Sequence, residues 1–302
     1  MTSPVAGTGG GTGARILDRR YQRYTGPRKG QAHAIRRLTL HAFQRFLGLR
    51  RPGKYKIVPF TIGILCYLPT IAFIGIAALI PVNNGTALVS YSQLFGIISG
   101  LVGLFIVTTG PGGLIADRNS KSLSLYLASP LDRNTYLLAH FAALMGTLAL
   151  VTVGPPLLYL LGSMFQGIGP AGVGAAAATA GKIVLAGGAI AAYYTALTMA
   201  VASVSNRAAQ AGVLLFLALS IPDALVGAAL LNSDAPDALL LLAPGTLPDE
   251  LVRRIFGPVA GALQAPIEFH LATALVVVGT AGWALGALAL VWYRYHRLDI
   301  SR

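Results

Sequence analysis

The chain consists of long apolar stretches separated by short polar segments. Residues 57 to 116 contain no Asp, Glu, Lys or Arg. Because one helix needs about 20 apolar residues to cross the hydrocarbon core of a membrane, this stretch predicts two spans. The sequence PVNNG at 81–85 supplies the turn between them. Four further apolar stretches follow, and the predicted spans are residues 57–80, 88–112, 137–161, 183–206, 208–231 and 269–293.

Composition agrees with this pattern and excludes an ordinary soluble domain. Hydrophobic residues make up 55% of the chain, charged residues make up 11%, and the mean hydropathy is +0.67. Soluble domains carry about 25% charged residues. The sequence therefore predicts an all-α membrane protein with six transmembrane helices. An even number of spans places both termini on the same side.

The distribution of basic residues predicts which side that is. Twenty of the 23 Lys and Arg residues fall before the first span, in the loops 2–3 and 4–5, or after the last span. Lys and Arg are retained on the cytoplasmic side during insertion. The long loop between spans 5 and 6, residues 232–268, instead contains five Asp or Glu residues. We therefore expect a protein of the plasma membrane with both termini in the cytoplasm.

The net charge of +13 would indicate a nucleic-acid partner in a soluble protein. Here more than half of the basic residues precede the first span, where anionic lipid headgroups attract them. The expected partners are therefore membrane lipids and no nucleic acid. The lone cysteine, Cys66, lies inside the first predicted span, so no intrachain disulfide can form, and nothing resembles a metal site.

The segment before the first span divides into two parts. Residues 1–14 are rich in Gly and Thr and are predicted to be disordered, whereas 15–56 form a basic segment. Within it, residues 31–49 have apolar positions at spacings of three or four, which predicts a helix lying in the cytoplasmic interface. This helix can also pack on the bundle. The six-span domain then covers 57–293, and 294–302 form a cytoplasmic tail; the basic residues assigned to the interfacial helix are Arg36, Arg37, His41 and Arg45.

The loop between spans 5 and 6 contains signals for two short helices. One is the run DALLLLAPG, and the other is TLPDELVRRIFGP, where Pro248 suits a first helical turn and Gly257 suits a stop. Neither helix is long enough to span. Two interpretations remain open, namely an outward-facing lid or re-entrant gate and a hairpin lying on the surface.

The loop between spans 2 and 3 predicts a short cytoplasmic helix at 117–130. Leu123, Tyr126 and Leu127 share one face, while Ser120, Lys121 and Ser124 lie on the other. Pro130 ends the helix and Asp132 can N-cap the next one. A helix held against two spans with its polar side turned to the cytosol suits contact with a soluble partner.

The sequence GGLIADRNSKSLSLYLASPLDRNTYLLAH resembles this loop in type-2 permeases of ATP-binding cassette (ABC) exporters. The matching residues are Asp117-Arg118, Leu123, Ser129-Pro130-Leu131 and Arg133. Ser124 departs from the family pattern, which usually has Glu at that position. The six spans, the interfacial helix and the paired short helices also resemble the family, over roughly residues 15–300.

The resemblance implies a permease subunit that works with separate ABC ATPase subunits and a second permease, identical or homologous. It assigns residues 117–130 as a coupling helix that ATP-driven closure pushes, together with the basic helix at 31–49. The expected exporter substrate is a lipid, drug, glycan or peptide. The residues then expected to contact the ATPase are Asp117, Arg118, Ser120, Lys121, Ser124, Pro130, Asp132 and Arg133.

The chain itself lacks a phosphate-binding loop. GTGGGTGAR has no Lys after its glycines, and ATAGKIV has Ala176 and Ile183 at positions that require Gly and Ser or Thr. We therefore expect that the chain is not an enzyme and binds no cofactor, with ATP and Mg on the partner ATPase.

Asp223 is the one ionisable residue within the fifth predicted span. Such a residue is a functional candidate on a transport path, but because Pro222 precedes it, Asp223 can equally cap a broken helix near the outer boundary. An ion-coupled carrier remains the alternative function, although carriers usually place several ionisable groups at mid-membrane depth. A membrane-embedded enzyme is less favoured, because no catalytic motif is present.

Overall fold

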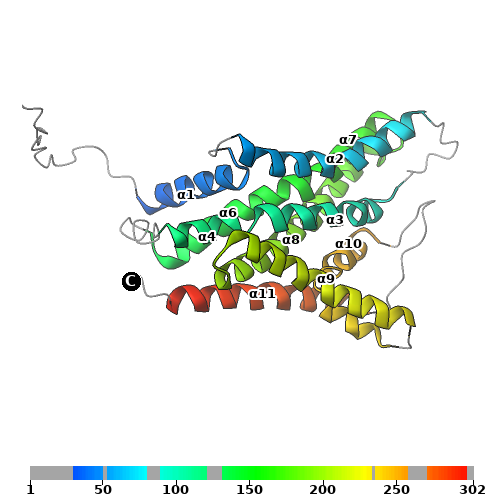
Figure 1. Cartoon of the computed structure of the whole chain (residues 1–302). Coiled ribbons are helices and arrows are strands. Elements are labelled where there is room, and N and C mark those ends of the chain that lie inside the picture. The colour runs from blue at the N-terminus through cyan, green and yellow to red at the C-terminus, as the bar shows by residue number, and fades with distance from the viewer. Residues whose placement is uncertain are drawn as a thin grey trace, which may run out of the picture.

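A computed structural model describes residues 30–49, 53–79, 89–120, 131–232, 235–257 and 271–297. Six of its helical stretches are long and apolar enough to cross a membrane, which confirms the predicted number of spans. Figure 1 shows them side by side in one bundle. The helices are α1 (Gln31–Phe46), α2 (Lys54–Leu79), α3 (Tyr91–Thr109), α4 (Gly112–Asn119), α6 (Arg133–Thr152), α7 (Gly154–Phe165), α8 (Gly172–Val204), α9 (Ala208–Asn232), the 3-10 helix η1 (Asp237–Leu242), α10 (Leu247–Phe256) and α11 (Thr273–Arg297).

Helix α8 occupies the centre of the bundle. In its most apolar window 72% of the residues are buried, whereas the corresponding fraction is 17% for α2 and α9 and 22% for α11. Small side chains make this possible, because a Cβ at Gly187 would lie 2.9 Å from the carbonyl oxygen of Thr152. The backbones of α6 and α8 therefore approach closely, as in other membrane helix pairs with glycine at the contact.

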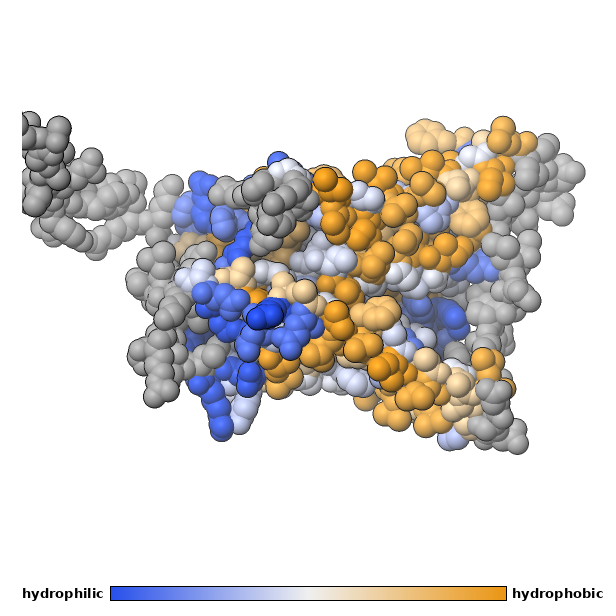
Figure 2. Space-filling model, viewed as in Figure 1, coloured by the Kyte–Doolittle hydropathy of each residue, from blue (hydrophilic) through white to orange (hydrophobic). Residues whose placement is uncertain are grey.

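The two ends of the bundle differ in composition. One end, here the basic end, contains α1, α4 and the C-terminal turns of α8 and α11; the described chain both begins and ends there (Figure 1). Figure 2 shows hydrophilic residues gathered at this end and a mostly apolar surface over the rest of the visible bundle. The other end, here the α10 end, contains η1, α10 and the C-terminal turns of α7 and α9.

The two largest departures from the predicted boundaries occur where charged residues lie inside helices. The fourth span begins at Gly172 and not at 183, since α8 continues through Lys182. The second span continues beyond a break at Gly110 and Pro111 into α4. Residues 117–119 therefore belong to the helix that extends span 2, and they do not start a separate coupling helix. Residues 121–130, the rest of that predicted helix, lie outside the described residues.

The third span is interrupted where the sequence has Gly154-Pro155-Pro156. Two consecutive prolines lack the N–H groups that would continue the helical ladder, so α6 ends at Thr152 and α7 begins at Gly154. The hydroxyl of Tyr67 in α2 donates to the Leu150 carbonyl at this break, with an O–O distance of 2.7 Å. A hydrogen bond from a neighbouring helix thus satisfies a polar group inside the apolar region.

Short helices occupy the two predicted segments between spans 5 and 6. Pro248 lies in the first turn of α10, with Asp249 and Glu250 beside it. Gly257 follows the helix with a φ of +87°, a conformation that favours glycine. The buried Glu250 pairs with Arg253 at 3.1 Å and with Arg254 at 2.9 Å, so the acidic start and basic end of α10 also bind each other.

Candidate functional site

The end of α4 is held by a buried carboxylate. Asp117 is 3% exposed and accepts hydrogen bonds from Arg45 of α1, from the hydroxyl of Tyr136 at 3.1 Å and from Nε2 of His140 at 3.1 Å. A buried charge is tolerated when it is paired and its oxygens are hydrogen-bonded. Asp117 therefore joins three elements, α1, α4 and α6, at the basic end.

Helix α1 reaches Asp117 because it packs closely on α4 and α6. Leu38, Ala42 and Phe46 form its buried face. The ring of Phe46 lies where a Cβ at Gly113 would be, so glycine is required for this approach. The same packing places Arg45, one residue before Phe46, beside the Asp117 carboxylate.

Arg118, the next residue, binds a different element, the C-terminal end of α8. Its guanidinium donates to the carbonyls of Ser203 at 2.8 Å, Ala202 at 3.4 Å and Ser205. The last carbonyls of a helix have no partner within the helix and carry partial negative charge. The arginine therefore caps α8 and fixes α4 to it. Asn119 adds a bond to the carbonyl of Asn206 at 3.0 Å.

Arg133, on the far side of the loop, forms the equivalent contact with α11. Its guanidinium donates to the carbonyls of Tyr295 at 3.0 Å and His296 at 2.6 Å, in the last turn of that helix. Residues 120–132, which we name the coupling loop after the role that the resemblance implies, are thus flanked in the sequence by two arginines that bind the C-terminal carbonyls of two different spanning helices. We describe this arrangement as the loop anchors.

The other predicted residues of this site fall into three groups. Ser120 and Asp132 are exposed. Asp132 occupies the N-cap position of α6, but its side chain makes no capping hydrogen bond there, so the predicted capping interaction is wrong. Lys121, Ser124 and Pro130 lie outside the described residues. On α1, Arg36 and Arg37 are exposed, and His41 is partly buried.

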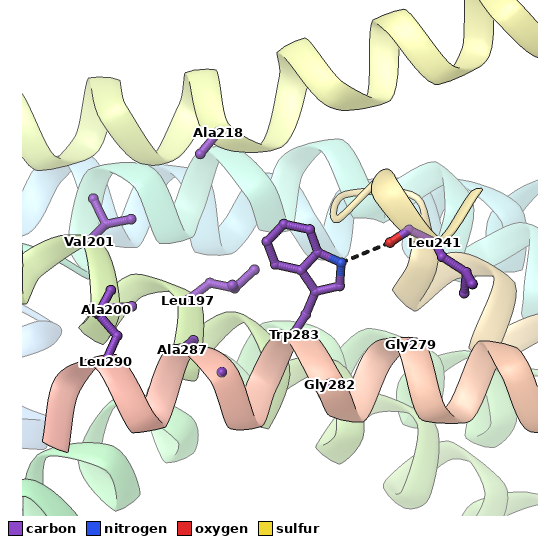
Figure 3. A pocket seen from close by; sticks show the side chains of 11 residues that line it. Leu197, Ala200, Val201, Ala218, Leu241, Gly279, Gly282, Trp283, Ala287 and Leu290 are labelled. Carbon is purple, nitrogen blue, oxygen red and sulfur yellow. Dashed lines mark hydrogen bonds between the residues drawn. The ribbon is translucent and has the colours of Figure 1, made fainter. Parts of the chain in front are cut away.

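A second loop is held at the α10 end. Residues 241–246, here the outer loop, comprise the last two residues of η1 and the segment that connects it to α10. Tyr193 donates to the Pro244 carbonyl at 2.8 Å and Tyr194 donates to the Gly245 carbonyl at 3.2 Å, both from α8. From α11, the indole N–H of Trp283 donates to the Leu241 carbonyl at 2.9 Å (Figure 3).

Asp223 completes the attachment of the outer loop. Helix α9 runs unbroken through Pro222 to Asn232, so the interpretation that Asp223 caps a broken α9 is wrong. Its Oδ1 accepts a hydrogen bond from the Gly245 amide at 3.0 Å, and a Cβ at Gly245 would clash with the carboxylate. Asp223 therefore binds the backbone just before α10, whose amides carry partial positive charge.

A model of ABC-2 family transporter proteins matches residues 17–300 of this chain. The chain belongs to the ABC-2 transporter family. This membership confirms the resemblance seen in the sequence, and it establishes a membrane transport subunit. No curated protein has a significantly similar sequence.

An apolar groove lies on the side of this ABC-2 protein, between α8, α9 and α11 (Figure 3). Its volume is about 610 Å³, and Gly282 and Gly286 form part of its floor. A Cβ at either glycine meets no atom within 4 Å. These glycines leave the groove open and do not pack against another helix of the described chain.

The sequence did not predict the contacts of five side chains at the two ends of the ABC-2 fold. Each is an aromatic or His residue within an apolar span, where a polar edge needs a hydrogen-bond partner. Tyr136 and His140 are four residues apart and therefore share one helix face, so their spacing could have indicated a shared hydrogen-bond partner. The five are Tyr136, His140, Tyr193, Tyr194 and Trp283. Within the described ranges, no group of three or more His, Cys, Asp or Glu residues could hold a metal.

Proposed function

We propose that this chain is the permease subunit of an ABC exporter, which moves a lipid, drug, glycan or peptide across the plasma membrane. ATP and Mg bind separate ATPase subunits, and this chain binds no cofactor. The observation that carries the proposal is the pair of loop anchors, Arg118 and Arg133. Arginines bound to the ends of two spans make the coupling loop a point where an external force is passed to the bundle.

The basic end faces the cytoplasm in this proposal. Arg36 and Arg37 are exposed there, and Lys and Arg concentrate on the cytoplasmic side of membrane proteins. Anionic lipid headgroups then contact the exposed face of α1. An ATPase subunit binds the coupling loop, and a second permease, identical or homologous, completes the complex.

The same two helices connect the coupling loop to the outer loop. Helix α8 is bound by Arg118 at its C-terminal end and carries Tyr193 and Tyr194 nearer its middle. Helix α11 is bound by Arg133 and carries Trp283. Helices are stiff along their axes, so a displacement of the coupling loop moves the donors that hold the outer loop. We infer that ATP-driven movement opens the α10 end by this route.

The proposal is tested by purifying the complex from the native host in mild detergent and reconstituting it in liposomes. A co-purifying subunit with a phosphate-binding loop is expected. In the double variant Arg118→Ala/Arg133→Ala, the ATPase should stay bound and hydrolyse ATP while substrate-dependent stimulation falls at least about tenfold. Arg207→Ala is the matched control, since Arg207 is an exposed arginine at the same end.

Two results would contradict the proposal. Purification without any ATPase, in several detergents and lipids, would favour the ion-coupled carrier. Full stimulation in the double variant would show that the loop anchors do not transmit the movement.

A further inference from the structure

A second cavity lies between α3, α9 and α10 and is distinct in character from the apolar groove. Its volume is about 430 Å³. The carboxylates of Asp223 and Asp249 line it, and Leu104, Val107, Phe216 and Leu219 form an apolar wall. The described residues that line it include no Lys, Arg or His. The cavity therefore combines negative charge with hydrocarbon surface.

The two carboxylates accept hydrogen bonds from neutral groups, and the N-terminus of α10 adds only partial positive charge. Asp223 is bound by the backbone amide of Gly245 and Asp249 lies beside the Ser99 hydroxyl, and both of these partners are neutral. Among the described residues, Arg253, one turn along α10, acts electrostatically on Asp249, and it also pairs with Glu250 at 3.1 Å. Two carboxylates facing one cavity repel each other, and a bound cation removes this repulsion.

The space in this cavity results from two glycines of α3. Gly100 and Gly103 line it, and a Cβ at either position would meet no atom within 4 Å. Larger side chains there would enter the cavity without displacing a packed neighbour. The cavity can therefore be filled by mutation without disturbing the bundle.

The chemistry of the lining distinguishes among possible ligands. An anion would face two carboxylates, and a bare Ca²⁺ ion prefers six to eight oxygen ligands, whereas most of this lining is hydrocarbon. An organic cation suits both parts, because its charge pairs with the carboxylates while its apolar groups contact the wall. The wall also includes Phe216, and aromatic rings attract cations.

We propose that this cavity binds the positively charged group of a cationic amphiphile, with the apolar wall taking its hydrocarbon part. The inference rests on the proposed function and names the substrate class of the exporter. Asp223 and Asp249 supply the charge recognition, and Phe216 and Leu219 contact the apolar part.

Direct binding to the purified full-length chain tests this proposal without any ATPase. The probes are tetraphenylphosphonium and tetraphenylborate, which are similar in size and opposite in charge, measured by equilibrium dialysis in a nonionic detergent. We expect specific binding of the cation only. The variant Asp223→Asn/Asp249→Asn should weaken it at least about tenfold, and Gly103→Leu should do the same by filling the cavity.

Asp237→Asn is the control, because it neutralises a carboxyl on η1 that does not line the cavity. Asn at 223 keeps an oxygen that can accept the Gly245 amide, so the outer loop stays attached. Equal binding of both probes, or cation binding that survives the Asp variants and Gly103→Leu, would overturn the proposal. Since no ATPase is present, that result leaves the exporter function standing.

The pH dependence of binding provides a second readout. Burial raises the pKa of Asp249 to about 7, while Ser99 of α3 and Arg253 of α10 oppose the rise and Asp223 of α9 adds to it. Tyr194 of α8 also faces this carboxyl. The cation competes with a proton at Asp249, so its binding should strengthen from about pH 6 to about pH 8. Asp249→Asn should abolish this change, and an unchanged pH profile in that variant would contradict the role of Asp249.

Discussion

The two ends of the bundle hold their loops by different chemistry. At the basic end, guanidinium groups bind helix-terminal carbonyls, and Asp117 is paired with Arg45. At the α10 end, hydroxyl and indole groups bind the outer loop, and most of these bonds are between neutral groups. Hydrogen bonds that involve a charge contribute about 1.5–3 kcal/mol, whereas neutral ones contribute about 1 kcal/mol. The basic end is thus the firmer attachment, and we expect the contacts at the α10 end to separate at lower cost.

The largest effect in this comparison is expected from Asp117→Ala. The substitution leaves Arg45 and His140 without their buried acceptor. Removing one partner of a buried ion pair lowers the free energy of unfolding by about 3–5 kcal/mol. Unfolding of the purified protein by SDS titration in mixed micelles measures this loss. Asp132→Ala, at an exposed carboxyl on the other side of the loop, should change stability by less than about 0.5 kcal/mol. Similar losses in both variants would show that Asp117 has no special structural role.

A smaller effect is expected from Arg118→Ala. It removes bonds from a charged donor to the Ala202, Ser203 and Ser205 carbonyls, and we expect a loss of about 1.5–3 kcal/mol in the same titration. Amide hydrogen exchange should accelerate in the last turn of α8 and not at the α10 end. A uniform acceleration over the whole chain would indicate general unfolding instead of a released anchor.

Tyr193→Phe should cost less than Arg118→Ala. The variant loses one neutral hydrogen bond, to the Pro244 carbonyl, and we expect about 1 kcal/mol. Trp283→Phe, which removes the bond to Leu241, gives an independent comparison at the same loop. If either variant destabilises the protein more than Arg118→Ala does, the ranking of the two ends is wrong.

A separate effect at the α10 end is a pH dependence of stability due to Asp249. Because its pKa is raised to about 7 by burial, the folded state binds a proton that the unfolded state has released between about pH 4 and pH 7. Stability from this group is therefore full below about pH 4 and falls as pH rises through about 7. Melting temperatures at about pH 5 and pH 8 should differ more for the wild type than for Asp249→Asn, in the direction of lower stability at pH 8. The opposite sign would mean that the carboxylate is favoured in the folded state.

The spans could be predicted from the sequence because the membrane excludes charge. Residues 57–116 contain no charged side chain, and two spans follow from length alone. The same reasoning failed where a charge lies within a helix. Lys182 lies inside α8, and Asp117 and Arg118 belong to α4. A helix at the membrane boundary tolerates such charges when they are paired or directed towards water.

The sequence singled out some residues of the candidate site, but it did not predict their contacts. Arg118 and Arg133 were singled out by their positions in the loop, yet their partners are backbone carbonyls, which carry no signature in the sequence. Asp117 was expected to contact a separate subunit, and its structural partners come from residues 45, 136 and 140. Such tertiary pairings depend on how helices pack, which one chain's hydropathy pattern does not encode.

The contact between Arg133 and the last turn of α11 has a practical consequence for protein engineering. The Tyr295 and His296 carbonyls accept from Arg133, and in a longer helix they would instead accept amides four residues further along. A reporter fused through a rigid helical linker that extends α11 would bring the amides of residues 299 and 300 into competition with Arg133 for these oxygens. A flexible Gly-Ser linker avoids that competition, so tags joined by such a linker are the ones expected to preserve transport.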